Sequence, residues 1–154
     1  MANSTPNLPT SSSFLLKIVA DFPDFSFRPG KKFSFRPPKT IFYPKDYNLE
    51  KLDSKSSYFK LSLLHEIGHA LSKHHSFDTC AKRVKMEVEA WEKARFLTKK
   101  YQLKVDEDFI ESELDSYRNW LYQKSKCPRC SLTRFETPDG NWHCPCCDFF
   151  KKHL

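Results

Sequence analysis

The sequence predicts an α+β fold, because short strand-like segments come first along the chain and longer helical segments follow. Residues 14–43 contain apolar runs and alternating phenylalanines, as strands with one buried face do. Residues 57–126 place apolar side chains at helical spacing. The last 28 residues, 127–154, hold five of the six cysteines and are predicted to form a separate small module. The main domain is therefore expected at residues 14–126.

The composition is that of one folded domain with a small addition. Of the 154 residues, 39% are hydrophobic and 29% are charged, which argues against a disordered chain and against a membrane protein. Residues 1–13 are rich in Ser, Thr, Asn and Pro and predict a disordered tail without a secretory signal. Cysteines gathered in one segment are typical of a metal site rather than of a disulfide framework, so a reducing, cytoplasmic location is expected.

The N-terminal strands are predicted from a short apolar run and a repeat. Residues 14–20 are rich in β-formers and predict the first strand. The run Phe-Ser-Phe-Arg-Pro occurs at residues 25–29 and again at 33–37, and its alternating phenylalanines give each copy one apolar face. A Pro-Gly turn between the copies predicts that they pair as a hairpin. Residues 40–43 predict one further strand.

Three predicted helices follow the strands, each with an apolar face for the core. The first spans residue 57 to about residue 75 and is apolar on most of its circumference. The second spans about residues 80–102 after an N-cap at Asp78 or Thr79, and the third begins after Asp106. The apolar stripes of these last two helices are Met86, Ala90, Ala94, Leu97 and Tyr101, and then Ile110, Leu114, Tyr117 and Leu121.

The net charge of +7 is concentrated in the N-terminal part of the chain. Residues 1–60 hold ten basic and five acidic side chains, and several of the basic ones alternate with aromatic residues. Such a surface can bind phosphates or acidic substrates, but lysines on strands more often serve solvation and edge protection. Nucleic acid is therefore kept as an alternative partner with weak support, and no membrane partner is expected.

The strongest chemical signal is His65-Glu66-Ile67-Gly68-His69. Two histidines four residues apart lie on one helix face, so both imidazoles can bind one metal ion. A zinc ion with three protein ligands lowers the pKa of its bound water to about 7, and Glu66 is placed to take the proton of that water as general base. Two surface histidines on an ordinary helix are the simpler interpretation, but unpaired His and Glu are costly in so apolar a helix. Gly68 predicts that a strand or a substrate backbone passes close by.

The residues alone leave the third ligand of this metal open between His74, His75 and a glutamate of the second helix. No turn residue follows the motif, so His74 and His75 are interpreted as the C-terminal end of the first helix, where the helix dipole favours them. Glu87 and Glu89 both flank the apolar stripe of the second helix. Periodicity therefore does not choose between these two carboxylates.

Two C-x-x-C pairs, Cys127 to Cys130 and Cys144 to Cys147, are separated by thirteen residues that include a predicted turn. This spacing predicts a zinc ribbon over residues 127–154. Four thiolates complete a tetrahedron and leave no open position, so Cys127, Cys130, Cys144 and Cys147 are expected to hold a structural zinc ion. Cys146 is left over, and Cys80 is interpreted as a small buried hydrophobic residue.

The motif and its surroundings resemble the gluzincin zinc metallopeptidases, in which His-Glu-x-x-His is followed on a later helix by a glutamate ligand. Nineteen residues separate His69 from Glu89, which is the thermolysin-like spacing. The run from Glu89 to Ala94 is similar to the Glu-Ala-x-x-x-Ala stretch of ImmA-like peptidases, and the size is that of minigluzincins. The resemblance implies a small zincin-like domain with a short N-terminal sheet, the motif helix and two further helices, in which His65, His69 and Glu89 hold a catalytic zinc ion. It departs at Lys93, where the thermolysin pattern has Asp.

The resemblance also implies a function and its competitors. The expected protein is a cytoplasmic zinc metallopeptidase, a hydrolase of protein or peptide substrates with Glu66 as general base, one catalytic zinc and one structural zinc. Zincins hold substrate backbone along an edge strand, for which a repeat copy or residues 40–43 are candidates, and Tyr117 is either an oxyanion donor or a core residue. The alternative is a regulatory or nucleic-acid- or protein-binding zinc protein, either an inactive zincin or a SprT-like DNA-associated protease.

Overall fold

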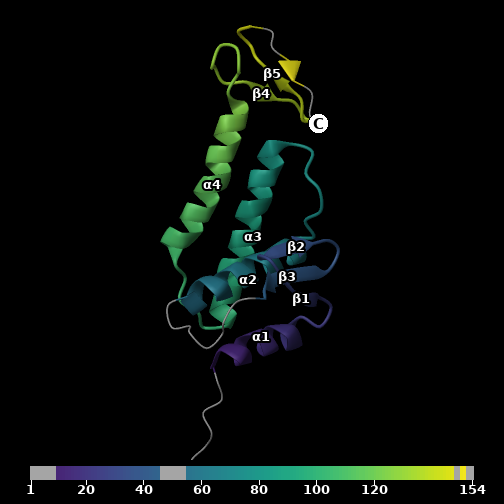
Figure 1. The fold of residues 1–154 in the computed structure, drawn as a ribbon, viewed down its shortest axis with the longest axis vertical. Coiled ribbons are helices and arrows are strands. Elements are labelled where there is room, and N and C mark those ends of the chain that lie inside the picture. Colours follow the sequence, from purple (N-terminus) through teal and green to yellow (C-terminus); the bar gives the residue numbers. More distant parts are fainter. Residues whose placement is uncertain (1–9, 46–54, 148–149, 152–154) are drawn as a thin grey trace, which may run out of the picture.

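The computed structural model describes residues 10–45, 55–147 and 150–151, and within these ranges it has the mixed α+β architecture that the sequence predicts (Figure 1). The helices are α1 (Thr10–Asp21), α2 (Lys55–Leu71), α3 (Cys80–Lys100) and α4 (Glu107–Ser125). One sheet contains β1 (Ser26–Gly30), β2 (Ser34–Arg36) and β3 (Thr40–Pro44), and the other contains β4 (Phe135–Glu136), β5 (Trp142–His143) and β6 (Phe150–Lys151). Of the predicted disordered tail, residues 1–9 lie outside the described residues, and residues 10–13 belong instead to helix α1.

The prediction of a strand at residues 14–20 is wrong, because this segment is part of helix α1. Phe14 and Ile18, one helical turn apart, are both buried, and the Phe14 ring packs edge-on against Tyr101 at the end of α3. The Tyr101 hydroxyl also donates a hydrogen bond to Asp21 at 2.8 Å. Burial of one helical face, with its contacts to Tyr101, thus outweighs the strand propensity of the Ile-Val pair.

The N-terminal sheet has the order β1-β3-β2, so the predicted hairpin of the two repeat copies is wrong. The copies do not pair with each other but lie on either side of β3, β1 parallel to it and β2 antiparallel. Phe27 and Phe35, the second phenylalanine of each copy, both lie opposite the fully buried Ile41. The two repeat copies therefore form the two edge strands of the sheet, β1 and β2, on either side of the central β3.

The three predicted helices are confirmed, with two of the predicted N-caps, but α2 ends at Leu71 rather than near residue 75. Thr79 accepts a hydrogen bond from the amide of Lys82, and Asp106 accepts one from the amide of Phe109. Helices α2 and α3 cross closely at Gly68, where an added Cβ would lie 2.3 Å from the carbonyl oxygen of Ala90. A backbone does pass close to Gly68, as expected, but it belongs to helix α3. Around this crossing the core gathers Leu61, Leu63, Leu64, Ile67, Ala90, Trp91, Ala94, Leu97, Ile110 and Leu114.

The C-terminal residues form the cysteine module, residues 127–147, which follows α4 directly and lies beyond the N-terminal end of α3 (Figure 1). Its antiparallel strands β4 and β5 are short. The Glu136 carboxylate accepts hydrogen bonds from the amides of Cys80 at 2.7 Å and Ala81 at 3.2 Å, at the start of α3. The module is thereby attached to the helical domain by a side chain as well as by the chain. Among the described helices, none has the length and apolarity needed to span a membrane.

Candidate metal centre

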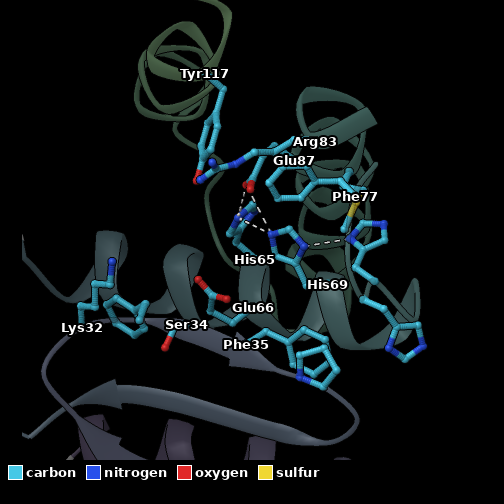
Figure 2. A pocket seen from close by; sticks show the side chains of 15 residues that line it. Lys32, Ser34, Phe35, His65, Glu66, His69, Phe77, Arg83, Glu87 and Tyr117 are labelled. Carbon is cyan, nitrogen blue, oxygen red and sulfur yellow. Dashed lines mark hydrogen bonds and ion pairs between the residues drawn. The ribbon is translucent and has the colours of Figure 1, made fainter. Parts of the chain in front are cut away.

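Helices α2 and α3 bring three ligand-type side chains together where they cross. His65 and His69 extend from α2, and Glu87 extends from α3 toward them (Figure 2). Glu87 Oε2 lies 3.1 Å from His65 Nε2 and 3.3 Å from His69 Nε2, and the two Nε2 atoms are 3.1 Å apart. These three atoms form a nearly equilateral triangle, so the side chains converge on one point.

The triangle has the size that a zinc ion requires. With zinc-to-ligand distances of about 2.0–2.1 Å, the edges of a tetrahedron are about 3.3–3.4 Å long. The observed separations of 3.1–3.3 Å match this value closely. Two imidazoles and one carboxylate also leave a fourth position for water or substrate. The donor set therefore fits a zinc ion with an open coordination position.

The third member of this cluster is Glu87, whereas the gluzincin-like spacing predicts Glu89. Glu89 instead lies at His74, with its Oε2 3.0 Å from His74 Nε2. The two glutamates are two residues apart, so they point about 200° apart around the helix. Glu87 shares a face with Ala90, which touches Gly68, and that face is turned toward α2. The contact between Gly68 and Ala90, rather than the apolar stripe that both glutamates flank, identifies Glu87 as the glutamate on this face.

The electrostatics of the cluster suit metal binding. Burial on its own would raise the pKa of Glu87, but hydrogen bonds from His65 and His69 lower it to about 2. Burial lowers the pKa of His65, against the opposing effect of its hydrogen bond to Glu87. At neutral pH the cluster thus offers a carboxylate and an uncharged imidazole, the forms in which these groups bind metal ions.

Glu66 lies beside the cluster, on the side of strand β2 (Figure 2). Burial raises its pKa to about 7, opposed by the charge of His69 and by a backbone hydrogen bond at Phe35. A carboxyl group with this pKa can both accept and release a proton near neutral pH. Glu66 is thus a titratable carboxyl group beside the cluster and next to strand β2.

A cavity of about 300 Å³ opens in front of these residues. Strand β2 and the segment before it form one wall, and Tyr117 of α4 and Arg83 of α3 reach in from the other side (Figure 2). Burial and the nearby Glu87 raise the pKa of Tyr117 to about 12, so its hydroxyl keeps its proton at neutral pH. Tyr117 is half-buried and lines the cavity, so it is not only a core residue.

Arg83 is a cavity residue that no sequence pattern indicated. Its guanidinium lies 4.8–5.5 Å from the ring centres of Phe77, Tyr117 and Trp120. These rings come from the loop before α3 and from α4, so only the tertiary structure assembles this aromatic surround. A cation held in this way can face an anionic group in the cavity.

The edge strand at the cavity is β2, the second copy of the repeat. Ser34 and Phe35 line the cavity, and β2 pairs with β3 along its other side. The candidate at residues 40–43 is wrong as an edge, because β3 occupies the centre of the sheet. Of the sequence candidates for an edge beside the cavity, only the second repeat copy is supported.

The four predicted cysteine ligands also lie together. Cys127 Sγ is 3.5 Å from Cys147 Sγ, and Cys130 Sγ is 3.5 Å from Cys144 Sγ and 3.7 Å from Cys147 Sγ. Zinc-to-sulfur distances of about 2.3 Å give tetrahedron edges of about 3.8 Å, so the cluster is compatible with a metal ion such as zinc. Cys146 is exposed and outside the cluster, and Cys80 is buried, as expected.

Comparisons with protein-family models, with curated protein sequences and with solved structures give no match to this chain. The gluzincin resemblance thus remains a prediction from the motif. The geometry of the two clusters is the basis for any functional proposal.

Proposed function

We propose that this protein is a zinc-dependent metallopeptidase, a hydrolase that cleaves peptide bonds in a protein or peptide substrate. The observation that carries the proposal is the convergence of His65, His69 and Glu87 within 3.3 Å of one another, beside Glu66 and an edge strand. The catalytic zinc is assigned to these three ligands. A second, structural zinc is assigned to the cysteine cluster of residues 127, 130, 144 and 147.

The roles of the side chains follow from their positions. A zinc ion held at the cluster would supply Lewis acidity toward a water molecule and a peptide carbonyl. Glu66 accepts a proton from the attacking water and passes it to the leaving amine, as its pKa of about 7 allows. The Tyr117 hydroxyl, protonated at neutral pH, donates a hydrogen bond toward the oxygen on which negative charge develops. The edge of β2 can pair with an extended substrate backbone.

Zinc stoichiometry tests the ligand assignment. Native mass spectrometry is expected to find two zinc ions per wild-type chain, one for each cluster. Glu87→Ala should lose one of them, whereas Glu89→Ala should keep both when zinc is in excess, because only Glu87 lies in the triangle. The pair is well matched, since both glutamates lie on α3 two residues apart. Loss of zinc from Glu89→Ala alone would instead support the gluzincin-like spacing.

Peptide cleavage tests the chemistry. A peptide-library digest is expected to show cleavage by the wild type and a loss of at least about 10²-fold for Glu66→Gln, which keeps the shape of the side chain but cannot take up a proton. The variant should still bind two zinc ions, because Glu66 is not among the cluster ligands. Cleavage that persists undiminished in Glu66→Gln would refute its role as the base. Two bound zinc ions without cleavage of any peptide would favour the alternative, a binding or regulatory zinc protein.

A further inference from the structure

A chain of two hydrogen bonds leads away from the metal cluster on the side opposite Glu87. His69 Nδ1 lies 2.8 Å from His74 Nδ1, and His74 Nε2 lies 3.0 Å from Glu89 Oε2. His74 is 7% exposed, so this histidine is buried between its two partners. The sequence interpretation of His74 as a helix end does not explain these contacts.

The end of helix α2 places His74 on His69. Helix α2 ends at Leu71, earlier than predicted, and Lys73 adopts the left-handed conformation with φ 54°. The amide of Lys73 donates to the carbonyl of Ala70, and the amide of His74 donates to the carbonyl of His69 at 3.1 Å. This pair of bonds is the Schellman arrangement, which reverses the chain direction at a helix end. The backbone of His74 is thereby fixed against the last turn of the motif.

The Glu89 carboxylate favours one position of the proton on each imidazole. An ionised carboxylate can only accept, so His74 Nε2 must carry the hydrogen. A neutral His74 then has an unprotonated Nδ1, which accepts a hydrogen bond from His69 Nδ1. His69 Nε2 is in turn unprotonated and can bind a metal ion. Without a metal ion, Glu87 Oε2 lies 3.3 Å from this nitrogen and favours a proton on it, so the two glutamates oppose each other across His69, and Glu89 favours the metal-binding form.

We propose that His74 and Glu89 are positioning residues that hold His69 in the tautomer and ring orientation needed for metal binding. This inference rests on the proposed function, since it assigns a purpose to His69 Nε2. It also explains why Glu89 lies on α3 close to the cluster without joining it. A carboxylate behind a metal-binding histidine typically changes metal affinity by 10–100-fold. Here the carboxylate acts through an intervening histidine.

The other histidine of the motif is held differently. His65 Nδ1 is buried and has no hydrogen-bond partner among the described residues. Its ring lies instead against Trp91, with the ring centres 4.2 Å apart and the planes at 30°. Packing on an indole fixes the ring plane but does not select a tautomer. The dyad of His74 and Glu89 is therefore expected to act directly on His69, and to reach His65 only through the 3.1 Å contact between the two Nε2 atoms.

The first experiment reads the tautomer directly. Two-bond ¹H–¹⁵N spectra at about pH 8, above the ordinary histidine pKa of about 6.5, distinguish the Nδ1–H from the Nε2–H form. Zinc-free Glu87→Ala lacks the carboxylate that competes for a proton on His69 Nε2, and in this variant His69 is expected in the Nδ1–H form. Adding His74→Leu should shift His69 to a mixture of the two forms. A His69 in the Nε2–H form in Glu87→Ala would overturn the inference.

The second experiment measures zinc affinity by competition with a fluorescent chelator. His74→Leu is expected to weaken binding at the histidine cluster by 10–100-fold, whereas His74→Asn, which retains an acceptor for His69 Nδ1, should recover most of the loss. A residue that only filled space would show the reverse order, because Leu is the better apolar filler. His75→Leu is the control, since the exposed His75 makes no contact with the chain of hydrogen bonds.

The outcomes separate the two proposals. Wild-type protein that binds zinc only at the cysteines would refute the catalytic centre, while the tautomer spectra would still decide the role of His74. Wild-type protein that binds zinc at both clusters, with His74→Leu unchanged in affinity and tautomer, would refute the dyad and leave the proposed function standing.

Discussion

The two clusters of metal-ligating side chains are built in opposite ways. In the cysteine module, Cys127 and Cys144 are two of the five residues that are buried among the described residues 127–147, the others being Arg134, Gly140 and Trp142. The histidine cluster instead lies on a helix crossing that is packed around fully buried Leu63, Leu64 and Ile67. The cysteine cluster provides much of the interior of its own module. The histidine cluster is held in position by a hydrophobic core that does not include it. A metal ion should therefore be needed for folding at the first cluster and not at the second.

Removal of metal is expected to have the largest effect on folding, and only the cysteine module should unfold. Structural zinc sites contribute on the order of 10 kcal/mol to the folding of small modules. A strong chelator should therefore collapse the amide resonances of residues 127–147 to random-coil positions, while those of α2, α3 and α4 keep their dispersion. Two-dimensional ¹H–¹⁵N spectra before and after chelation measure both regions in one sample.

Single variants serve as the control for that comparison. Cys130→Ser removes one cysteine ligand and should reproduce the unfolding of the module without any chelator. Cys146→Ser alters the exposed neighbouring thiol and should leave the spectrum unchanged. Spectra in which the helical domain unfolds along with the module would contradict the proposed difference between the two regions.

The helix crossing is expected to be the most sensitive point of the histidine region. In an isolated helix Gly68→Ala would stabilise by about 1 kcal/mol, because Ala has the higher helix propensity. Here the new methyl group would lie 2.3 Å from the carbonyl oxygen of Ala90, which is backbone and cannot turn aside. We expect overpacking to dominate, with a net loss of about 1–3 kcal/mol in the free energy of unfolding. Urea denaturation followed by circular dichroism measures this loss.

The same variant should weaken zinc binding at the histidine cluster, because a wider crossing separates Glu87 from His65 and His69. Ser62→Ala, on the same helix, is the control and should change neither property by much. Stabilisation by Gly68→Ala would mean that the two helices are farther apart than the 2.3 Å approach indicates.

Sequence reasoning succeeded where the chemistry is local. The motif of His65 and His69, the two cysteine pairs and the N-caps Thr79 and Asp106 depend on spacings within a few residues, and their predicted geometry is found in the structure. It failed where partners are distant in sequence. Residues 14–20 form a helix because of their contact with Tyr101, and the repeat copies are separated by β3.

The choice between Glu87 and Glu89 as the third member of the histidine cluster also depends on a contact that is distant in sequence. Glu87 and Glu89 differ only in their angle around α3, and the approach of Gly68 to Ala90 fixes that angle. A spacing taken from a family resemblance cannot report it, since a change of two residues in the connection moves the ligand to another side of the helix. Turn rules likewise do not predict the chain reversal at Lys73, because they expect glycine at a left-handed position and this residue is a lysine.

The smallest expected effect concerns the link between the two regions. Glu136 of the cysteine module accepts hydrogen bonds from the amides of Cys80 and Ala81, so a side chain 55 residues away completes the N-terminal turn of α3. Helix N-terminal amides favour a carboxylate, and removal of such a cap costs about 1 kcal/mol. Glu136→Ala is therefore expected to destabilise the zinc-loaded helical domain by about that amount in urea denaturation. Glu113→Ala, an exposed change on α4, should have no comparable effect.

The zinc dependence of this loss distinguishes a link between regions from a local effect. Once chelation has unfolded the cysteine module, Glu136 is no longer held at the start of α3, and Thr79 is left as the cap of that turn. Glu136→Ala should then leave the stability of the helical domain unchanged. Zinc at the cysteines would in this way stabilise the helix that carries Glu87, coupling the two clusters by about 1 kcal/mol. An equal loss with and without zinc would show instead that Glu136 acts independently of the folded module.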